Sequence, residues 1–153
     1  MKTFMYKLAI AAGLLLPASI LLNGCSKSDT YASISSNQDY VETNLLNRAV
    51  FVSSATDDGV NISDNFNGYT FNFVSTASGA TSGKAYANGP TISVEGNWAL
   101  TYGRDRITFD IPTALMANLS FLNKEWIINK GTNPVKLTAA DGENDQLEFA
   151  TPR

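Results

Sequence analysis

Apolar and polar side chains alternate most regularly in Thr91-Ile92-Ser93-Val94-Glu95-Gly96-Asn97-Trp98-Ala99-Leu100-Thr101-Tyr102. Successive side chains of a β-strand point to opposite faces, so this alternation predicts one strand with a buried face and an exposed face. The predicted buried face carries Ile92, Val94, Gly96, Trp98, Leu100 and Tyr102. A glycine interrupts this row, which favours a bulge or a sharp bend at Gly96.

Shorter stretches of the same apolar–polar alternation occur along the chain on both sides of this strand. Further strands are predicted at 49–55, 68–75, 84–88, 106–111, 125–129, 134–139 and 146–150, separated by Gly, Asn, Asp and Pro. About eight short strands favour an all-β fold, an antiparallel up-and-down barrel or sandwich. A short helix is predicted at 39–47, and a single helical turn at 113–119.

The N-terminus has the three parts of a secretory signal. Lys2 and Lys7 form a positive start, and 8–22 is apolar apart from Ser19. This run is too short to span a hydrocarbon core, which needs about 20 apolar residues. Leu22-Asn23-Gly24-Cys25 then matches a bacterial lipobox, in which the cysteine becomes the lipid-carrying first residue. The alternative is an ordinary signal peptide or membrane anchor with an incidental cysteine.

Three segments are therefore expected: a lipoprotein signal peptide at 1–24, a lipidated flexible tether at 25–38 and a barrel domain at 39–153. The tether is small and polar, and its full reach is about 40 Å. Each buried acyl CH₂ contributes about 0.8 kcal/mol, so two or three chains such as palmitate anchor a protein firmly. The expected location is the bacterial outer membrane, with the domain periplasmic or surface-exposed.

The composition excludes several classes of site. The 153 residues contain no histidine and one cysteine, Cys25, which is the expected lipidation site. Ser-His-Asp and Cys-His catalysis, zinc sites with His or Cys ligands, and disulfides are therefore excluded. Without residues 1–24 the chain has 9 basic and 14 acidic residues, a net charge of −5, and no basic run. Nucleic-acid binding, a cofactor and enzymatic activity are not expected.

Five spaced motifs resemble a known family. They are Asp58-Gly59, Phe66-Asn67-Gly68-Tyr69-Thr70-Phe71-Asn72-Phe73, Glu95-Gly96-Asn97-Trp98, Leu122-Asn123-Lys124-Glu125-Trp126 and Leu147-Glu148-Phe149. Over about 46–150 their order and spacing are similar to those of the small lipocalin-like lipoproteins common in Bacteroidetes-type bacteria. The resemblance implies a calycin-type β-barrel on a lipid anchor, and no particular activity. One departure concerns the first strand, where the family usually has a tryptophan and this chain has Phe51 nearby.

Eight aromatic side chains are expected to point into the barrel: Tyr69, Phe71, Phe73, Trp98, Tyr102, Phe109, Trp126 and Phe149. An eight-stranded barrel is either just filled by side chains or holds one small ligand. Both alternatives stay open, because eight aromatic side chains are enough to fill the interior. If a pocket exists, the candidate ligand-binding residues at its mouth are Tyr69, Trp98, Tyr102 and Trp126, since tyrosine and tryptophan carry a polar group.

Three polar groupings have both a functional and a structural interpretation. The loop 141–145, Asp-Gly-Glu-Asn-Asp, offers oxygen ligands for Ca²⁺ but lacks the spacing of an EF-hand, which favours a hairpin loop. Three carboxylates suggest a glycosidase pair, but strand parity places them outside the barrel: Glu95, Asp110 and Glu125. The turn 103–106 offers Arg104 and Arg106 to an anion or polysaccharide, or is an exposed charged turn. No metal site is expected.

The sequence leaves three functions open. The first is a lipid-anchored cell-envelope lipoprotein whose lipocalin-like barrel binds a small apolar or amphiphilic ligand. The alternative is a filled barrel that serves as an interaction or structural subunit of a cell-surface complex. A carboxylate-dependent enzyme ranks last. The expected partners are the membrane, through acyl chains on Cys25, and a small hydrophobic ligand or a protein.

Overall fold

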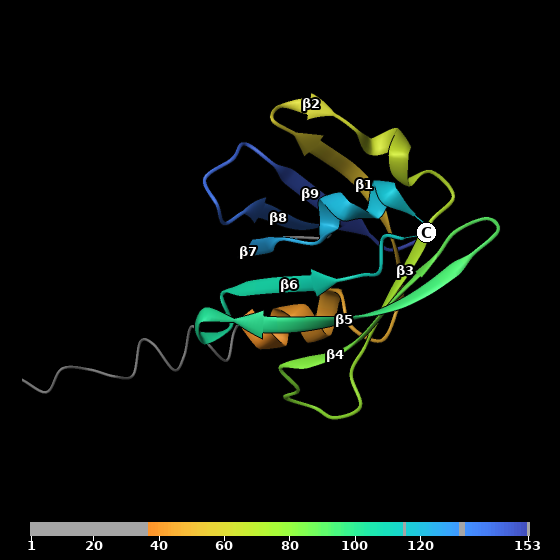
Figure 1. Cartoon of the computed structure of the whole chain (residues 1–153). Coiled ribbons are helices and arrows are strands. Elements are labelled where there is room, and N and C mark those ends of the chain that lie inside the picture. The colour runs from red at the N-terminus through yellow and green to blue at the C-terminus, as the bar shows by residue number, and fades with distance from the viewer. Residues whose placement is uncertain (1–36, 115, 132–133, 153) are drawn as a thin grey trace, which may run out of the picture.

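A computed structural model describes residues 37–114, 116–131 and 134–152 (Figure 1). The leader and Cys25 lie outside the described residues, as does most of the expected tether. The described chain begins with a helix at 37–44. It continues through nine strands and three 3₁₀ turns: β1 (Ala49–Asp57), β2 (Val60–Asn61), η1 (Ser63–Phe66), β3 (Thr70–Val74), β4 (Ser82–Asn88), β5 (Ser93–Thr101), η2 (Tyr102–Arg104), β6 (Arg106–Asp110), η3 (Ala117–Leu122), β7 (Glu125–Asn129), β8 (Val135–Ala139) and β9 (Gln146–Ala150).

Eight of these strands form a closed antiparallel barrel in the order β1-β3-β4-β5-β6-β7-β8-β9, and β1 pairs with β9 to close it. The two-residue β2 pairs with the end of β1 across a tight turn. Asp58 and Gly59 in this turn have φ of 48° and 79°. Two successive positive φ values suit the right-handed twist of a hairpin, and Asp-Gly is a favoured pair there. The predicted all-β, eight-stranded antiparallel barrel is confirmed.

The core lies inside the barrel and consists of the inward-facing row of each strand. Most of the aromatic residues expected inside are buried: Phe71, Phe73, Trp98, Phe109, Trp126 and Phe149. Four of them meet in the middle and are called the aromatic cluster here: Phe71, Phe73, Phe109 and Phe149. Five ring pairs among them have centroid separations of 4.8 to 6.4 Å. Such aromatic pairs contribute about 0.5–1.5 kcal/mol beyond the area they bury.

Two glycines permit close approach between neighbouring segments. The pairing of β4 with β5 keeps one register through Gly96, so of the two predicted alternatives, a bulge or a sharp bend, the bulge is wrong at this pairing. A β-carbon at Gly96 would instead lie 2.2 Å from the carbonyl oxygen of Asp110. At Gly83 a β-carbon would lie 2.0 Å from the carbonyl oxygen of Val74 and 2.8 Å from the indole nitrogen of Trp98. Both positions need glycine because any side chain would collide with the backbone.

Short helical segments cover both ends of the barrel. Successive strands alternate in direction, so the start of β1 and the end of β6 lie at opposite ends. Helix 37–44 precedes β1 and contributes buried Val41, with Leu45 buried just after it. At the other end, η3 follows β6 and buries Leu119 and Leu122. Figure 1 shows the helix, in orange, close to the β5–β6 connection.

The observed boundaries differ from the expected ones by a few residues. The helix occupies 37–44 rather than 39–47, so it includes two residues of the expected tether, Asn37 and Gln38. The helical turn expected at 113–119 is the 3₁₀ turn η3, three to four residues later. In the described part of the chain, no helix is both long and apolar enough to cross a membrane.

We predict that Phe73→Ala lowers the free energy of unfolding by about 3–5 kcal/mol, because it leaves a cavity where three other rings now make contact. The matched control is Phe51→Ala, since Phe51 is 38% exposed, and its cost should stay below about 1 kcal/mol. Equilibrium urea unfolding, followed by tryptophan fluorescence, measures both. Equal costs for the two variants would contradict this packing.

Candidate functional site

Trp98 and Trp126 are both part of the core. Their exposed fractions are 1% and 0%. The indole nitrogen of Trp98 donates a 3.1 Å hydrogen bond to the carbonyl of Val74 at the end of β3. The indole nitrogen of Trp126 donates a 3.0 Å hydrogen bond to the carbonyl of Leu122 in η3. The two side chains are therefore buried and fixed by different segments, Trp98 by β3 and Trp126 by η3.

Tyr69 and Tyr102 differ from each other in position. Tyr69 is half-buried, stacks on Phe71 at 6.2 Å, and its hydroxyl lies 3.5 Å from the side-chain oxygen of Asn118. The expectation that Tyr102 points inward is wrong, because its exposed fraction is 69%. Strand β5 ends at Thr101, and Tyr102 enters a turn with φ of 46°. Its ring packs outside the barrel against the guanidinium of Arg106, 4.2 Å from the ring centroid.

The three carboxylates considered for catalysis face outward, as strand parity predicted. Asp110 is exposed, and Glu95 forms a 2.7 Å ion pair with Lys84. The hydrogen bond and charge of Lys84 lower the pKa of Glu95. Glu125 accepts hydrogen bonds of 2.8 Å from Thr101 and 2.7 Å from Arg106, which lower its pKa. Glu95 and Glu125 therefore belong to cross-strand pairs on the outer surface.

The acidic loop 141–145 contains a buried carboxylate that the sequence pattern did not reveal. Asp145 has an exposed fraction of 0%. It accepts hydrogen bonds from the Lys124 ammonium and, at 2.7 Å, from the backbone N–H of Asp58. Burial acts to raise the pKa of Asp145, but the hydrogen bonds from Lys124 and Asp58 outweigh it and lower the pKa. Among the described residues, no group of three or more His, Cys, Asp or Glu is placed to hold a metal.

The two arginines predicted to offer an anion contact are already engaged. Arg104 donates to the side-chain oxygen of Gln38 in the helix, and Arg106 pairs with Glu125 at 2.7 Å. Gln38 in turn donates a 3.0 Å hydrogen bond to Glu42. Glu42 also accepts a 2.7 Å hydrogen bond from the backbone N–H of Gly79. This chain of contacts joins the helix to the β5–β6 and β3–β4 connections.

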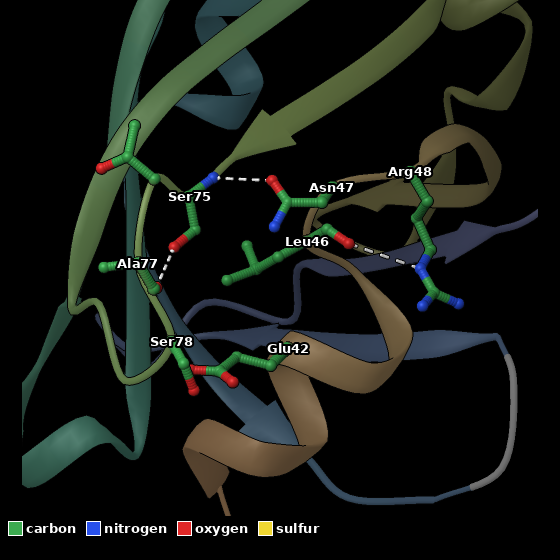
Figure 2. Close-up of a pocket in the computed structure, with 8 residues that line it drawn as sticks. Glu42, Leu46, Asn47, Arg48, Ser75, Ala77 and Ser78 are labelled. Carbon is green, nitrogen blue, oxygen red and sulfur yellow. Dashed lines mark hydrogen bonds between the residues drawn. The ribbon is translucent and has the colours of Figure 1, made fainter.

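Beside this network lies a hollow of about 450 Å³, which we call the helix-end cleft. It is open to solvent and mostly polar. Its walls are the end of the helix, the segment that enters β1, and the β3–β4 connection. Figure 2 shows seven of its eight lining residues with labels; the full set is Glu42, Leu46, Asn47, Arg48, Ser75, Thr76, Ala77 and Ser78.

Asn47 holds the walls of the cleft together. Its φ of 54° lies in the left-handed region, which asparagine tolerates better than most residues. Its backbone N–H donates a 2.8 Å hydrogen bond to the carbonyl of Phe73. Its side-chain oxygen accepts a 2.9 Å hydrogen bond from the backbone N–H of Ser75 (Figure 2). The segment before β1 is thereby fixed to the end of β3.

A second hollow of about 430 Å³ lies over β4, β5 and β6. Outward-facing side chains of these strands line most of it, including Ser82, Lys84, Asn97, Ala99 and Thr108. We call it the sheet-face hollow. The small side chains of Ser82, Ala99 and Thr108 leave the outer surface low here.

Comparisons with known proteins place the fold. It is similar to a DUF4847 family protein from Bacteroides vulgatus ATCC 8482, known from a crystal structure at 1.00 Å resolution. The TM-score is 0.54 with 14% sequence identity, and the match covers 73% of this chain and 97% of that chain. At this identity the likeness establishes a shared β-barrel fold and nothing further. No protein-family model and no curated protein matches the sequence.

We predict that Asp145→Asn destabilises the fold by about 1–3 kcal/mol near neutral pH, because Lys124 and the Asp58 N–H lose a charged acceptor. The folded-state pKa of Asp145 is lowered, so its stabilisation is complete above the ordinary aspartate pKa of about 3.9. It is lost as the pH falls through the lower folded-state value.

Urea unfolding at a series of pH values measures this contribution. The stability of the Asp145→Asn variant should fall less steeply below pH ~4 than that of the wild type. Asp141→Asn in the same loop, where the side chain is largely solvent-accessible, is the control and should follow the wild type. If both variants behave alike, the buried ion pair is not a major contributor.

Proposed function

We propose that this protein is a lipid-anchored cell-envelope lipoprotein whose barrel, filled by its own side chains, acts as a rigid interaction module. In this proposal the outer surface binds another envelope component, and no ligand enters the barrel. The proposal places the chain among the small lipocalin-like lipoproteins that its motifs resemble. The observation that carries it is the set of ring contacts within the aromatic cluster.

The aromatic cluster occupies the middle of the barrel. Phe73 alone contacts Phe71, Phe109 and Phe149, with ring centroids 4.8 to 6.4 Å apart. An eight-stranded barrel is either just filled by side chains or holds one small ligand, and rings in mutual contact favour the filled alternative. An internal apolar or amphiphilic ligand, the first function that the sequence suggested, would have to displace these rings.

The covered ends of the barrel also support the proposal. At one end Val41 and Leu45 are buried against the core, and at the other Phe66 and Phe121 pack 6.1 Å apart. Phe121 also contacts Trp126, with ring centroids 5.3 Å apart. To enter the barrel, a ligand would have to displace the side chains that cover one end and also rings of the aromatic cluster.

The proposed anchor lies a short distance along the sequence before the helix. The lipobox at 22–25 predicts an acyl group on Cys25, and helix 37–44 starts about 12 residues later. A chain of that length reaches about 40 Å when fully extended. In this proposal the tether leads into the helix end of the barrel, so the helix would stay within about 40 Å of the membrane.

A fluorescence titration tests whether the barrel is filled. Trp98 and Trp126 are the two tryptophans of the chain, and both contact the core. We expect that cis-parinaric acid, a fluorescent fatty acid, leaves the emission of the wild type unchanged. Phe109→Ala removes a ring at 4.8 Å from Phe73, and we expect benzene, a guest of the size of the missing ring, to bind this variant and raise its melting temperature, because a small apolar cavity accepts a small apolar guest.

Phe109→Leu is the control, because it keeps most of the volume and should bind as little as the wild type. Stoichiometric binding of the fatty acid to the wild type, with quenching of both tryptophans, would overturn the proposed function. Native mass spectrometry of the protein purified from its own host is a second test. The measured mass should be that of the acylated chain without a co-purified small molecule.

A further inference from the structure

The two ends of the barrel differ in charge. The helix end carries the segment before β1 and the connections after β3, β5 and β7: 37–48, 75–81, 102–105 and 130–134. The opposite end, called the acidic end here, carries the connections after β1, β4, β6 and β8: 58–69, 89–92, 111–124 and 140–145.

Among the described residues of the helix end, acidic and basic side chains balance: Asp39, Glu42 and Asp105 against Arg48, Arg104 and Lys130. The charged side chains described in the connections of the acidic end are mostly carboxylates: Asp58, Asp64, Asp141, Glu143 and Asp145 against Lys124. Like charges repel, so an anionic surface repels the acidic end more strongly than the helix end.

The helix end exposes an aromatic ring that strand alternation would bury. Tyr102 directly follows β5, and a continued strand would place its side chain inside with that of Trp98. Instead, Tyr102, Gly103 and Arg104 have successive φ values of 46°, 66° and 76°, and Tyr102 is 69% exposed. The left-handed region is unfavourable for bulky side chains, and strain of this kind clusters at functional sites. The turn therefore presents an aromatic side chain outward at a cost in backbone strain.

A second exposed apolar side chain lies next to the same arginine as Tyr102. The Arg106 guanidinium lies 4.2 Å from the centroid of the Tyr102 ring, and Arg106 is the register partner of Ile127 on β7. Ile127 is 37% exposed, and Glu125 neutralises the charge of Arg106 at 2.7 Å. An exposed tyrosine beside a neutralised arginine and an aliphatic side chain has the amphipathic character of residues at a membrane–water interface.

The expected tether enters the fold beside this turn. Arg104 donates a hydrogen bond to the side-chain oxygen of Gln38, the second residue of helix 37–44. About 12 residues separate Cys25 from the helix, so acyl chains on Cys25 would keep the turn close to a bilayer. We propose that the helix end of the barrel docks on the lipid bilayer, with Tyr102 and Ile127 in the headgroup zone. The acidic end then points away from the bilayer and stays open to a partner.

This inference rests on the proposed function, because docking needs the acyl chains on Cys25. The acylated full chain is placed in vesicles of phosphatidylethanolamine with a minority of phosphatidylglycerol, both with brominated acyl chains that quench nearby tryptophans. The native Trp98 and Trp126 are 1% and 0% exposed, so the wild type should lose little emission. Tyr102→Trp keeps an aromatic ring next to Arg106, and its loss of emission should be at least about twofold larger, because tryptophan also favours the headgroup zone.

Val60→Trp is the matched control, because Val60 is 64% exposed but lies at the acidic end, and this variant should behave like the wild type. A second pair of chains tests the tyrosine ring itself. Both carry Ser78→Trp as a reporter in the exposed connection 75–81, and adding Tyr102→Ser should lower the quenching of that reporter at least about twofold.

Equal quenching of Tyr102→Trp and Val60→Trp would overturn the inference, as would a reporter signal that Tyr102→Ser leaves unchanged. The intact mass of the same samples separates this failure from that of the proposed function. A chain without acyl groups on Cys25 would overturn both. An acylated chain in which Tyr102→Trp is not quenched would overturn the inference alone.

Discussion

Aromatic rings from β3, β6 and β9 contact one another in the middle of the barrel, and the rest of the core packs around this contact. Four rings approach one another across the interior: Phe71, Phe73, Phe109 and Phe149. The residues next to them on the neighbouring strand are small. On β4 the residues paired with Phe71 and Phe73 are Ala87 and Ala85, so large side chains on one strand meet small ones on the next. Such alternation allows a core to reach native density without strain. Gly83 and Gly96 lie where there is no room for a side chain. The carbonyl of Val74 and the indole of Trp98 lie close to Gly83, and the carbonyl of Asp110 lies close to Gly96.

In the proposed function, the filled interior leaves the outer surface of the barrel as the region that binds a partner. The helix 37–44 is fixed by hydrogen bonds through Gln38 and Glu42 to two connections between strands, and this arrangement forms the walls of the helix-end cleft. The cleft is therefore built on the same packed body as the core and on segments tied to each other. The proposed tether leads into this same end of the barrel.

Alternation in the sequence predicts the strands and the inward position of most aromatic side chains, because one period-two pattern determines both. It also predicts the outward position of Glu95, Asp110 and Glu125. It fails for Tyr102, since alternation does not indicate where a strand ends, and β5 stops one residue earlier. Asp145 is buried because Lys124 and Asp58, far away in sequence, provide its partners. The cleft was missed for the same reason, since Asn47 and Ser75 are 28 residues apart. Its one local signal is an asparagine just before the first strand.

The central claim is that side chains leave no guest-sized space within the barrel, and xenon binding tests this most directly. Xenon enters dry apolar cavities and scatters X-rays strongly, so crystals held under xenon pressure reveal any internal void. The account predicts no xenon peak between β3, β6 and β9, where the aromatic cluster lies. An ordered xenon atom among Phe71, Phe73, Phe109 and Phe149 would contradict it, because the barrel would then have the space that an internal ligand requires.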